Sequence, residues 1–448
     1  MECMKESNIE GIGQIPFSWD STRRIKDLFT ISKGLSITKK DLVDEGVAVI
    51  SYGQIHSKEN TGVRTLPSLI RYVESCHIRG KSDSLVRKGS FIFADTSEDL
   101  EGCGNCVYVD CDDTIYAGYH TIVFSGSEND YRYLAYLFKT DAWRLQIRKN
   151  VYAVKVYTVS QKILKECKIL IPPLYEQHAI ADYLDSQCTK IDSIIYDLEK
   201  QIEILQKYKK ALITEVVTKG LDKTVPMKDS GIEWIGAIPA HWDAKRLKYL
   251  ISTSLQYGAN EAGDEFTEEH PRYIRITDIT EDNKLKDEGK LSLDSKLAKP
   301  YMLEDGDVLF ARSGATVGKS FYYCNEYGPA AFAGYLIKAK TRTDKLYSKF
   351  LYYTTLGIGY DNWKNTVFTQ ATIQNIGADK YAQLIVTVPP LSEQETIINY
   401  LDDVCEKIDE ILEIKRSQRD RMLRHKKSII FEYTTGKKRV KEAMQHAN

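Results

Sequence analysis

The sequence predicts an α+β protein in which two mixed α/β domains are joined and separated by two long antiparallel coiled-coil helices, related by an internal pseudo-two-fold repeat. The first reason is a duplication, because residues 171–195 return as residues 388–412 with more than half of the aligned residues identical. The second is that each copy continues with apolar residues at seven-residue spacing, which is typical of a coiled coil. The third is that strand and helix patterns alternate in the segment before each copy.

The composition is that of an ordinary globular protein with room for several domains. The 448 residues are 42% hydrophobic and 28% charged, and the formal net charge is -1. No apolar run is long enough to cross a membrane, and the N-terminal residues lack the apolar core of a secretion signal. Nine scattered cysteines fit a reducing compartment, so we expect a cytoplasmic protein. If the chain binds nucleic acid, its near-zero net charge requires local basic patches.

The chain begins with a second repeated segment. Residues 5–20 return as residues 228–243, and both copies combine glycine, proline and a Trp-Asp pair. We call these two stretches the Trp segments. Their composition predicts an ordered loop that docks on another surface, rather than a regular element.

The first mixed domain, with its Trp segment, is expected over residues 1–172. Residues 131–148 have the apolar spacing of a helix. Four short strands are also predicted, because β-branched and aromatic residues there lie between glycines and charged turns. The predicted strands lie near residues 47–53, 90–94, 106–109 and 121–124.

Two long spacer helices are predicted, over residues 173–220 and 390–436. Both begin after a pair of prolines and end near a glycine, as helices often do. One alternative stays open, which is a single buried core helix in each half. The apolar seam positions are Leu184, Ile191, Leu198, Leu205 and Leu212 in the first helix, and Leu401, Ile408, Met422 and Ile429 in the second.

The second mixed domain, with its Trp segment, is expected over residues 221–389, and residues 437–448 form a basic tail. Residues 304–313 repeat the framework of residues 87–96, while the residues between the shared positions differ. Two copies of one scaffold that carry two different surfaces are suited to binding an asymmetric target whose two parts lie at a fixed separation. Duplex DNA offers such targets.

The motif Pro-Pro-Leu-x-Glu-Gln opens both long helices, at residues 172–177 and 389–394. Together with the Trp-Asp pairs, it makes nearly the whole chain resemble the specificity subunits of type I restriction-modification systems. Residues 306–319, Gly-Asp-Val-Leu-Phe-Ala-Arg-Ser-Gly-Ala-Thr-Val-Gly-Lys, resemble a recurrent segment of that family's target recognition domains. The first domain departs from the pattern, because residues 94–99 read Ala-Asp-Thr-Ser-Glu-Asp where the family has Ala-Arg-Ser-Gly.

The resemblance implies a non-catalytic subunit that binds an asymmetric bipartite site in double-stranded DNA through two target recognition domains. It implies two DNA methyltransferase subunits and restriction/translocase subunits as partners. Adenine-N6 methylation and ATP-dependent cleavage would be performed by those partners, so S-adenosylmethionine, ATP and Mg are expected there and no cofactor in this chain. We expect methyltransferase subunits to pack on the helices and the Trp segments. The expected subunit-interface residues are Trp19, Glu176, Gln177, Trp242, Glu393 and Gln394.

Candidate DNA-binding residues come from strand ends and from segments that interleave cations, amides and aromatic rings, such as residues 148–157 and 362–370. Arginine and lysine contact phosphates or guanine edges, and asparagine or glutamine contacts adenine. For each residue the alternative is a solvated surface position. The predicted DNA-binding residues are Tyr52, Gln54, His56, Lys149, Lys155, Tyr157, Arg275, Thr277, Arg312, Lys319, Lys364, Thr369 and Gln370.

Three further patterns carry weaker alternatives. Residues 313–320 nearly spell a phosphate-binding loop, but that motif needs glycine at position 313, where serine stands. Cys103, Cys106 and Cys111 have metal-like spacing without a close fourth ligand, so we predict no metal site. The basic run over residues 415–427 is either a solvated helix face or a contact with DNA or an acidic partner.

No catalytic motif for methyl transfer, metalloprotease or serine hydrolase chemistry stands in the sequence. The alternative function is a coiled-coil adaptor with two protein-binding heads, and a fused nuclease comes third.

Overall fold

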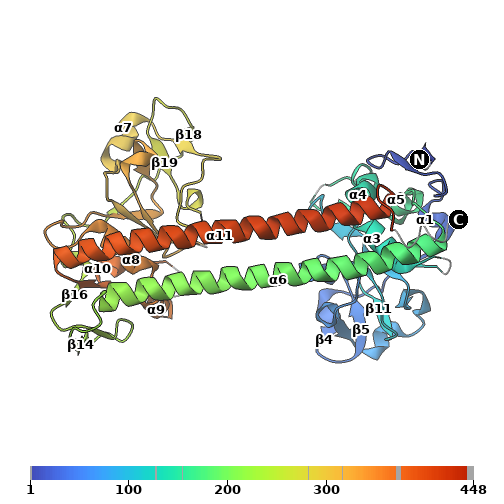
Figure 1. Ribbon diagram of the computed structural model, residues 1–448, viewed down its shortest axis with the longest axis horizontal. Coiled ribbons are helices and arrows are strands. Elements are labelled where there is room, and N and C mark those ends of the chain that lie inside the picture. The colour runs from blue at the N-terminus through green and yellow to red at the C-terminus, as the bar shows by residue number, and fades with distance from the viewer. Residues whose placement is uncertain are drawn as a thin grey trace. The chain divides into compact units, whose positions relative to one another are not determined.

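The computed structural model describes residues 3–126, 129–153, 155–280, 282–314, 316–369 and 375–440 (Figure 1). The chain divides into two compact units, one formed by Met1–Leu198 with Ser417–Asn448 and the other by Glu199–Arg416. Two long helices, α6 (Leu174–Lys219) and α11 (Leu391–Thr434), contribute residues to both units. Each unit therefore consists of one mixed domain, which we call a head, and half of each long helix.

The first head contains two sheets. One has the strand order β4-β6-β5-β11-β7 with β5 and β11 parallel, and the other is antiparallel with the order β10-β8-β12-β3. The strands are β3 (Thr30–Lys33), β4 (Leu42–Val43), β5 (Val47–Ile50), β6 (Arg71–Val73), β7 (Leu85–Val86), β8 (Phe91–Ala94), β10 (Cys106–Tyr108), β11 (Ile115–Ala117) and β12 (Thr121–Ser125), with a short pair of β9 (Thr96–Ser97) and β13 (Tyr157–Thr158). The helices are α1 (Ile25–Leu28), α2 (Tyr52–Ile55), α3 (Tyr131–Phe138), α4 (Asp141–Arg148) and α5 (Gln161–Glu166).

Aromatic side chains join the antiparallel sheet to α3 and α4. Phe93 of β8 lies 5.4 Å from Phe138 and 6.3 Å from Trp143, measured between ring centroids, and all three are buried. The predicted single helix over residues 131–148 is wrong in one respect, because the chain forms two helices. Thr140 causes the break, since its hydroxyl caps α4 by accepting a hydrogen bond from the Trp143 N–H.

One predicted strand is also shorter than expected. The strand near residues 47–53 ends at Ile50, and Tyr52–Ile55 forms the single helical turn α2. Ser51 and Gln54 form a capping box there, and the Gln54 side chain accepts from the Ser51 N–H at 3.2 Å.

The second head repeats this layout. Its antiparallel sheet has the order β17-β24-β21-β22, its other sheet has the order β18-β20-β19-β23 with β19 and β23 parallel, and β16 pairs with β25. The strands are β16 (Asp243–Arg246), β17 (Gln256–Tyr257), β18 (Asp264–Glu265), β19 (Arg272–Ile274), β20 (Leu291–Ser292), β21 (Val308–Ala311), β22 (Ser320–Tyr322), β23 (Ala330–Phe332), β24 (Leu336–Ala339) and β25 (Ile385–Val388). The helices are α7 (Ser295–Ala298), α8 (Ser348–Leu356), α9 (Ile358–Thr369) and α10 (Ala378–Ala382).

The Trp segments form hairpins, so the prediction that they lack regular structure is wrong. Strand β1 (Met4–Glu6) pairs with β2 (Gln14–Pro16), and β14 (Met227–Asp229) pairs with β15 (Ala237–Pro239). Glycines at positive φ, such as Gly13 at 66° and Gly236 at 70°, let the connecting loop turn back into the second strand.

The halves of α6 and α11 pack against each other within each unit. In the first unit the Tyr183 and Tyr433 rings lie 4.4 Å apart and Lys426 pairs with Asp192, which makes the two segments antiparallel. In the second unit Ile202, Ile408 and Leu412 form a buried cluster between the helices. Each buried Leu or Ile side chain contributes roughly 1.5–3 kcal/mol. The seven-residue pattern therefore marks a paired coiled coil, and not a single core helix in each half.

No helix among the described residues combines the length and apolar character that crossing a membrane requires.

Candidate nucleic-acid interface

Gln177 and Gln394, equivalent residues of the repeated motif, tie the start of each long helix to its head. The Gln177 side-chain oxygen accepts from the Asp130 N–H at 2.9 Å, and that of Gln394 accepts from the Tyr347 N–H at 2.9 Å. Each amide also donates to the carbonyl five residues earlier in the chain, at 2.8 and 2.9 Å respectively. An amide side chain is suited to this position because it donates and accepts at once.

The neighbouring glutamates hold the two tryptophans of the Trp segments. The indole N–H of Trp19 donates to Glu176 at 3.0 Å, and that of Trp242 donates to Glu393 at 2.9 Å. Both indoles are fully buried. The Trp segments therefore dock on the first turn of a long helix of their own chain.

The second carboxylate oxygen has a different partner in each copy. In the first unit Arg439 pairs with Glu176 at 2.7 Å, and these side chains are 7% and 1% exposed. In the second unit His241 contacts Glu393 at 2.7 Å, where the carboxylate is 41% exposed. Burial raises the pKa of Glu176, against the opposing effect of the Trp19 hydrogen bond.

These contacts bear on the six residues that we expected at a subunit interface. All of them except Glu393 are buried, and all six make hydrogen bonds within the chain. The internal contacts account for the repetition of the motif. Contact with a methyltransferase subunit stays a prediction for this group of residues.

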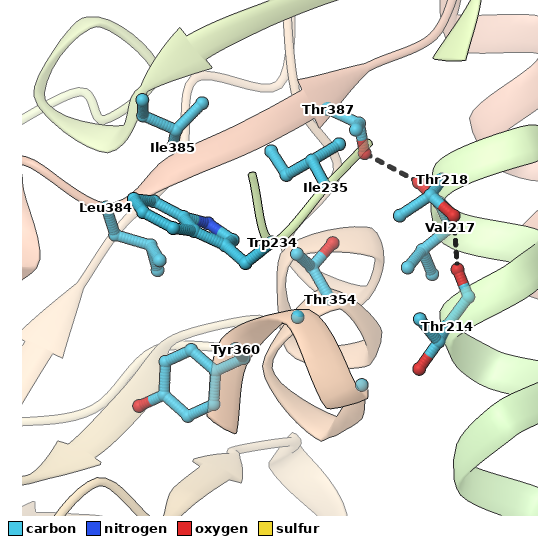
Figure 2. Close-up of a pocket in the computed structure, with 12 residues that line it drawn as sticks. Thr214, Val217, Thr218, Trp234, Ile235, Thr354, Tyr360, Leu384, Ile385 and Thr387 are labelled. Atoms are coloured by element: carbon cyan, nitrogen blue, oxygen red, sulfur yellow. Dashed lines mark hydrogen bonds between the residues drawn. The ribbon is translucent and has the colours of Figure 1, made fainter. Parts of the chain in front are cut away.

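Figure 2 shows the second Trp segment against the end of α6 and the helices α8 and α9. Trp234 and Ile235 line a cavity of about 20 Å³ there, and the Thr387 hydroxyl donates to the Val217 carbonyl at 2.6 Å. The first Trp segment has Gly11 at the position of Trp234. A cavity of this size holds about one water molecule, so it is a packing gap and not a ligand site.

A polar groove of about 370 Å³ lies between the long helices and the second head, and we call it the second groove. Two predicted DNA-binding residues, Lys319 and Lys364, line it together with Lys209 and Lys210 of α6. The fold thus brings together cations that are far apart in the sequence. The Lys319 ammonium donates to the Thr280 carbonyl at 2.6 Å, which orients it along the head.

Carboxylates neutralise most of the charge in the second groove. Asp361 pairs with Lys364 at 2.7 Å and also with Lys210, and Asp409 pairs with Lys209 at 2.5 Å. Burial acts to raise the pKa of Asp361, but the hydrogen bonds from the two lysines outweigh it and the pKa is lowered. The second groove is therefore polar without being strongly basic.

The first unit has an equivalent groove of about 690 Å³ between α11 and the first head, which we call the first groove. Its lining includes four cations, Lys139, Arg144, Arg148 and Lys427. Burial, together with the neighbouring cations Lys426 and Arg144, lowers the pKa of Lys139 to about 8. Lys427 belongs to the basic run and Arg148 opens the segment 148–157, but the sequence did not single out Lys139 or Arg144, because they lie at the end of α3 and within α4 without a local motif.

In the first head, Tyr52 and His56 lie close together on and beside α2, with their rings 6.2 Å apart. Both ring nitrogens of His56 are engaged, Nε2 with the Thr96 carbonyl at 2.8 Å and Nδ1 with the Asn105 amide at 3.1 Å. Gln54 is half-buried and caps α2. The Tyr52 ring is half-buried as well.

The predicted residues of the segment 148–157 have separate environments. Lys149 pairs with Glu10 of the first Trp segment. Lys155 is exposed, and Tyr157 is half-buried in β13 opposite Ser97. The structure does not gather these three cationic and aromatic side chains into one site.

In the second head, Arg275 is held by Asp278, with donor–acceptor distances of 3.0 and 2.7 Å, while Thr277 is exposed. The Arg312 guanidinium lies over the Tyr257 ring at 4.9 Å. Arginine on an aromatic face keeps its outer N–H groups available to a phosphate or base.

Two predicted residues remain. Thr369 ends α9, and Gln370 lies outside the described residues.

The phosphate-loop and zinc alternatives have no support in the fold. Lys319 leads into strand β22, whereas a phosphate-binding loop opens a helix. All nine cysteines are free. Across the part of the chain that the structure describes, no three His, Cys, Asp or Glu side chains gather as metal ligands do.

Comparison with known families gives one match that covers most of the chain. The model described as the type I restriction modification DNA specificity domain matches residues 16–204 and 264–419. The two matched stretches take in most of both heads and parts of both long helices.

Two similar relatives are specificity subunits of Methanocaldococcus jannaschii. The type I restriction enzyme MjaVIII specificity subunit is 27% identical over 295 residues, which are 63% of this chain and 65% of the relative. The putative type I restriction enzyme MjaX specificity subunit is 24% identical over 461 residues, which are 98% of this chain and 99% of the relative.

A solved structure described as concerning complex assembly and conformational transition of the type I R-M system has the same fold, with a TM-score of 0.63 at 16% identity. The match covers 94% of this chain and 98% of that chain.

Proposed function

This chain belongs to the type I restriction modification DNA specificity family, and from that premise we propose that it binds an asymmetric, two-part site in double-stranded DNA. It is the specificity subunit of such a system. Each head would bind one part of the site.

The observation that carries the proposal is the contrast between repeated anchoring and unlike head surfaces. The Gln and Glu contacts at the two helix starts are nearly the same in both units. At equivalent positions after β8 and β21, however, the first head has Asp95 and the second has Arg312. An aspartate and an arginine give the two head surfaces opposite charge and different hydrogen-bonding groups at this position, so the two half-sites should differ.

Catalysis is assigned to partners in this proposal. Two DNA methyltransferase subunits and restriction/translocase subunits would assemble on the chain, methylate adenine at N6 and cleave DNA with ATP. S-adenosylmethionine, ATP and Mg would bind those partners and not this chain. The complex would work in the cytoplasm, which fits nine free cysteines.

The test is selection from a random duplex pool by this chain with its methyltransferase partner. We expect enrichment of a single site with two unlike parts and a fixed gap. Enrichment of a palindrome, or of nothing, would count against the proposal.

The adaptor alternative is favoured by one observation, the net charge of -1. The salt dependence of binding distinguishes a DNA-binding subunit from an adaptor. For a DNA-binding subunit, the logarithm of the affinity for duplex DNA should fall steeply with the logarithm of the salt concentration. A flat salt response with retained protein binding would favour the adaptor.

A further inference from the structure

We propose that His120 in the first head reads a base edge in one half-site and that Asp95 positions its ring. The inference rests on the proposed function, since it names a specificity-determining residue of the DNA site. No motif in the sequence points to His120, and it was not among the predicted DNA-binding residues.

The backbone at His120 is in an unusual conformation. Its φ is +54°, in the left-handed region that non-glycine residues rarely adopt. The conformation is held on both sides, because the His120 carbonyl accepts from the Asp95 N–H at 3.1 Å and the Tyr52 N–H donates to the Tyr119 carbonyl at 3.3 Å. Such strain costs on the order of 1 kcal/mol and tends to occur at binding sites.

The conformation presents an oriented imidazole to solvent. The His120 side chain is 59% exposed, and its Nδ1 lies 3.1 Å from the Asp95 carboxylate. Asp95 is itself fixed by the Thr96 hydroxyl, which donates to it at 2.7 Å. A carboxylate at Nδ1 selects the tautomer with the proton there, which leaves the Nε2 lone pair as an acceptor. Among the described residues Nε2 has no hydrogen-bond partner.

Aromatic rings flank the imidazole. Tyr52 lies 5.5 Å from the His120 ring and Tyr119 lies 6.1 Å from it, both edge-on. Tyr52 was predicted to bind DNA from its position, and it also lines a cleft of about 510 Å³ in the first head. His56, which was also predicted to bind DNA, cannot accept a hydrogen bond from a base because both of its ring nitrogens have partners within the head.

The chemistry specifies what would be read. An imidazole that accepts at Nε2 pairs with an exocyclic amine, which is N6 of adenine or N4 of cytosine in the major groove. The second head has Arg312 where the first has Asp95, so this device belongs to one half-site only.

The experiment compares the wild-type chain with His120→Gly, each with its methyltransferase partner, in selection from random duplexes. Glycine tolerates a positive φ, so the variant should unfold at the same or a higher temperature. We expect it to lose base preference, roughly tenfold or more, at one or two positions of one half-site. The other half-site should be unchanged.

A second measurement tests the contact itself. The selected adenine or cytosine is replaced by the analogue that lacks the exocyclic amine. Wild-type affinity should fall roughly tenfold, while His120→Gly should show no further loss. Asp95→Asn, which no longer fixes the tautomer, should weaken discrimination less than His120→Gly does.

His77→Ala is the matched control, because it removes another histidine of the same head and should leave selection unchanged. If His120→Gly keeps the wild-type base preference at every position, the inference about His120 is wrong but the proposed function stands. The same holds if the variant loses base preference equally in both half-sites. Failure of the wild type to select any two-part site overturns the proposed function and this inference together.

Discussion

Glu176 and Glu393 occupy the same place in the repeated motif but differ in how deeply they are buried. Glu176 is buried together with Arg439, whereas Glu393 is partly open to solvent beside His241. Removing one partner of a buried ion pair leaves the other charge uncompensated. The same substitution should therefore have unequal effects in the two units.

We expect Glu176→Ala to lower the free energy of unfolding by about 3 kcal/mol, since it removes the buried carboxylate that pairs with Arg439 and accepts from the Trp19 indole. Glu393→Ala should cost about 1 kcal/mol, because solvent replaces the lost carboxylate. Urea denaturation of both variants measures the difference. Equal losses would mean that burial does not distinguish the two copies.

Lys139 predicts a dependence of stability on pH. Its pKa is about 8 in the folded chain and roughly 10.4 when unfolded. The unfolded state therefore binds the extra proton between these values, so the contribution of Lys139 to stability rises as the pH rises from 8 to about 10.4. Below pH 8 the buried charge costs stability.

We expect Lys139→Met to stabilise the chain at pH 7, by up to about 3 kcal/mol, with the gain shrinking as the pH rises toward 10. Urea unfolding at pH 7 and pH 9.5 measures it. Lys149→Met, which removes an exposed lysine paired with Glu10, is the control and should give no pH-dependent gain. A gain that is the same at both pH values would contradict the assignment.

Sequence reasoning reached the motif residues but not their internal role. Repetition marked Trp19, Glu176 and Gln177 as a group, yet a repeat does not say whether the matching surface lies on the same chain or on another. Lys139 and Arg144 of the first groove were missed for a related reason, since the cations of this groove converge only when α3, α4 and α11 pack.

At the scale of elements, the long helices were predicted closely because their signal is long and periodic. The expected spacers over residues 173–220 and 390–436 hold helices Leu174–Lys219 and Leu391–Thr434. Short elements were harder to predict, because one side chain decides them. Thr140 divides a predicted helix in two, and the Gln54 side chain, which accepts from the Ser51 N–H, stabilises a helical turn where a strand was predicted.

Both long helices end at a glycine in the left-handed conformation, Gly220 at φ +73° and Gly436 at φ +70°. A Cβ at Gly220 would lie 3.1 Å from the Trp242 ring, but at Gly436 it would lie 2.4 Å from the Pro16 ring. Proline cannot move aside as a side chain can.

We expect Gly220→Ala to lower stability by about 1 kcal/mol through the positive φ, and Gly436→Ala to cost clearly more through the added clash. Thermal unfolding compares them. A larger loss for Gly220→Ala would reverse the order that the contacts predict.

For the molecule as a whole, the two grooves differ in net charge although they occupy equivalent places. Lys210 of the second groove is paired with Asp361, whereas Lys427 of the first is exposed on α11. A lysine that already has a carboxylate partner releases fewer counterions when DNA binds.

If the first groove contacts DNA, Lys427→Gln should reduce the slope of log affinity against log salt by about 1. Lys210→Gln should change it little. Titration of duplex DNA with the complex of this chain and its methyltransferase partner, at several salt concentrations, measures both slopes. Identical slopes for Lys427→Gln and the wild type would exclude the first groove from the DNA path.

The first unit is built from two stretches that are far apart in the sequence, Met1–Leu198 and Ser417–Asn448. Residues 417–440 supply it with the Thr434 carbonyl that accepts from Tyr133, and with the Arg439 partner of Glu176. During synthesis all residues of the second unit therefore leave the ribosome before the last residues of the first unit do, although synthesis of the first unit starts earlier. A stop codon introduced directly after codon 416 should therefore destabilise the first unit, which is encoded mostly upstream of it, and leave the second unit intact.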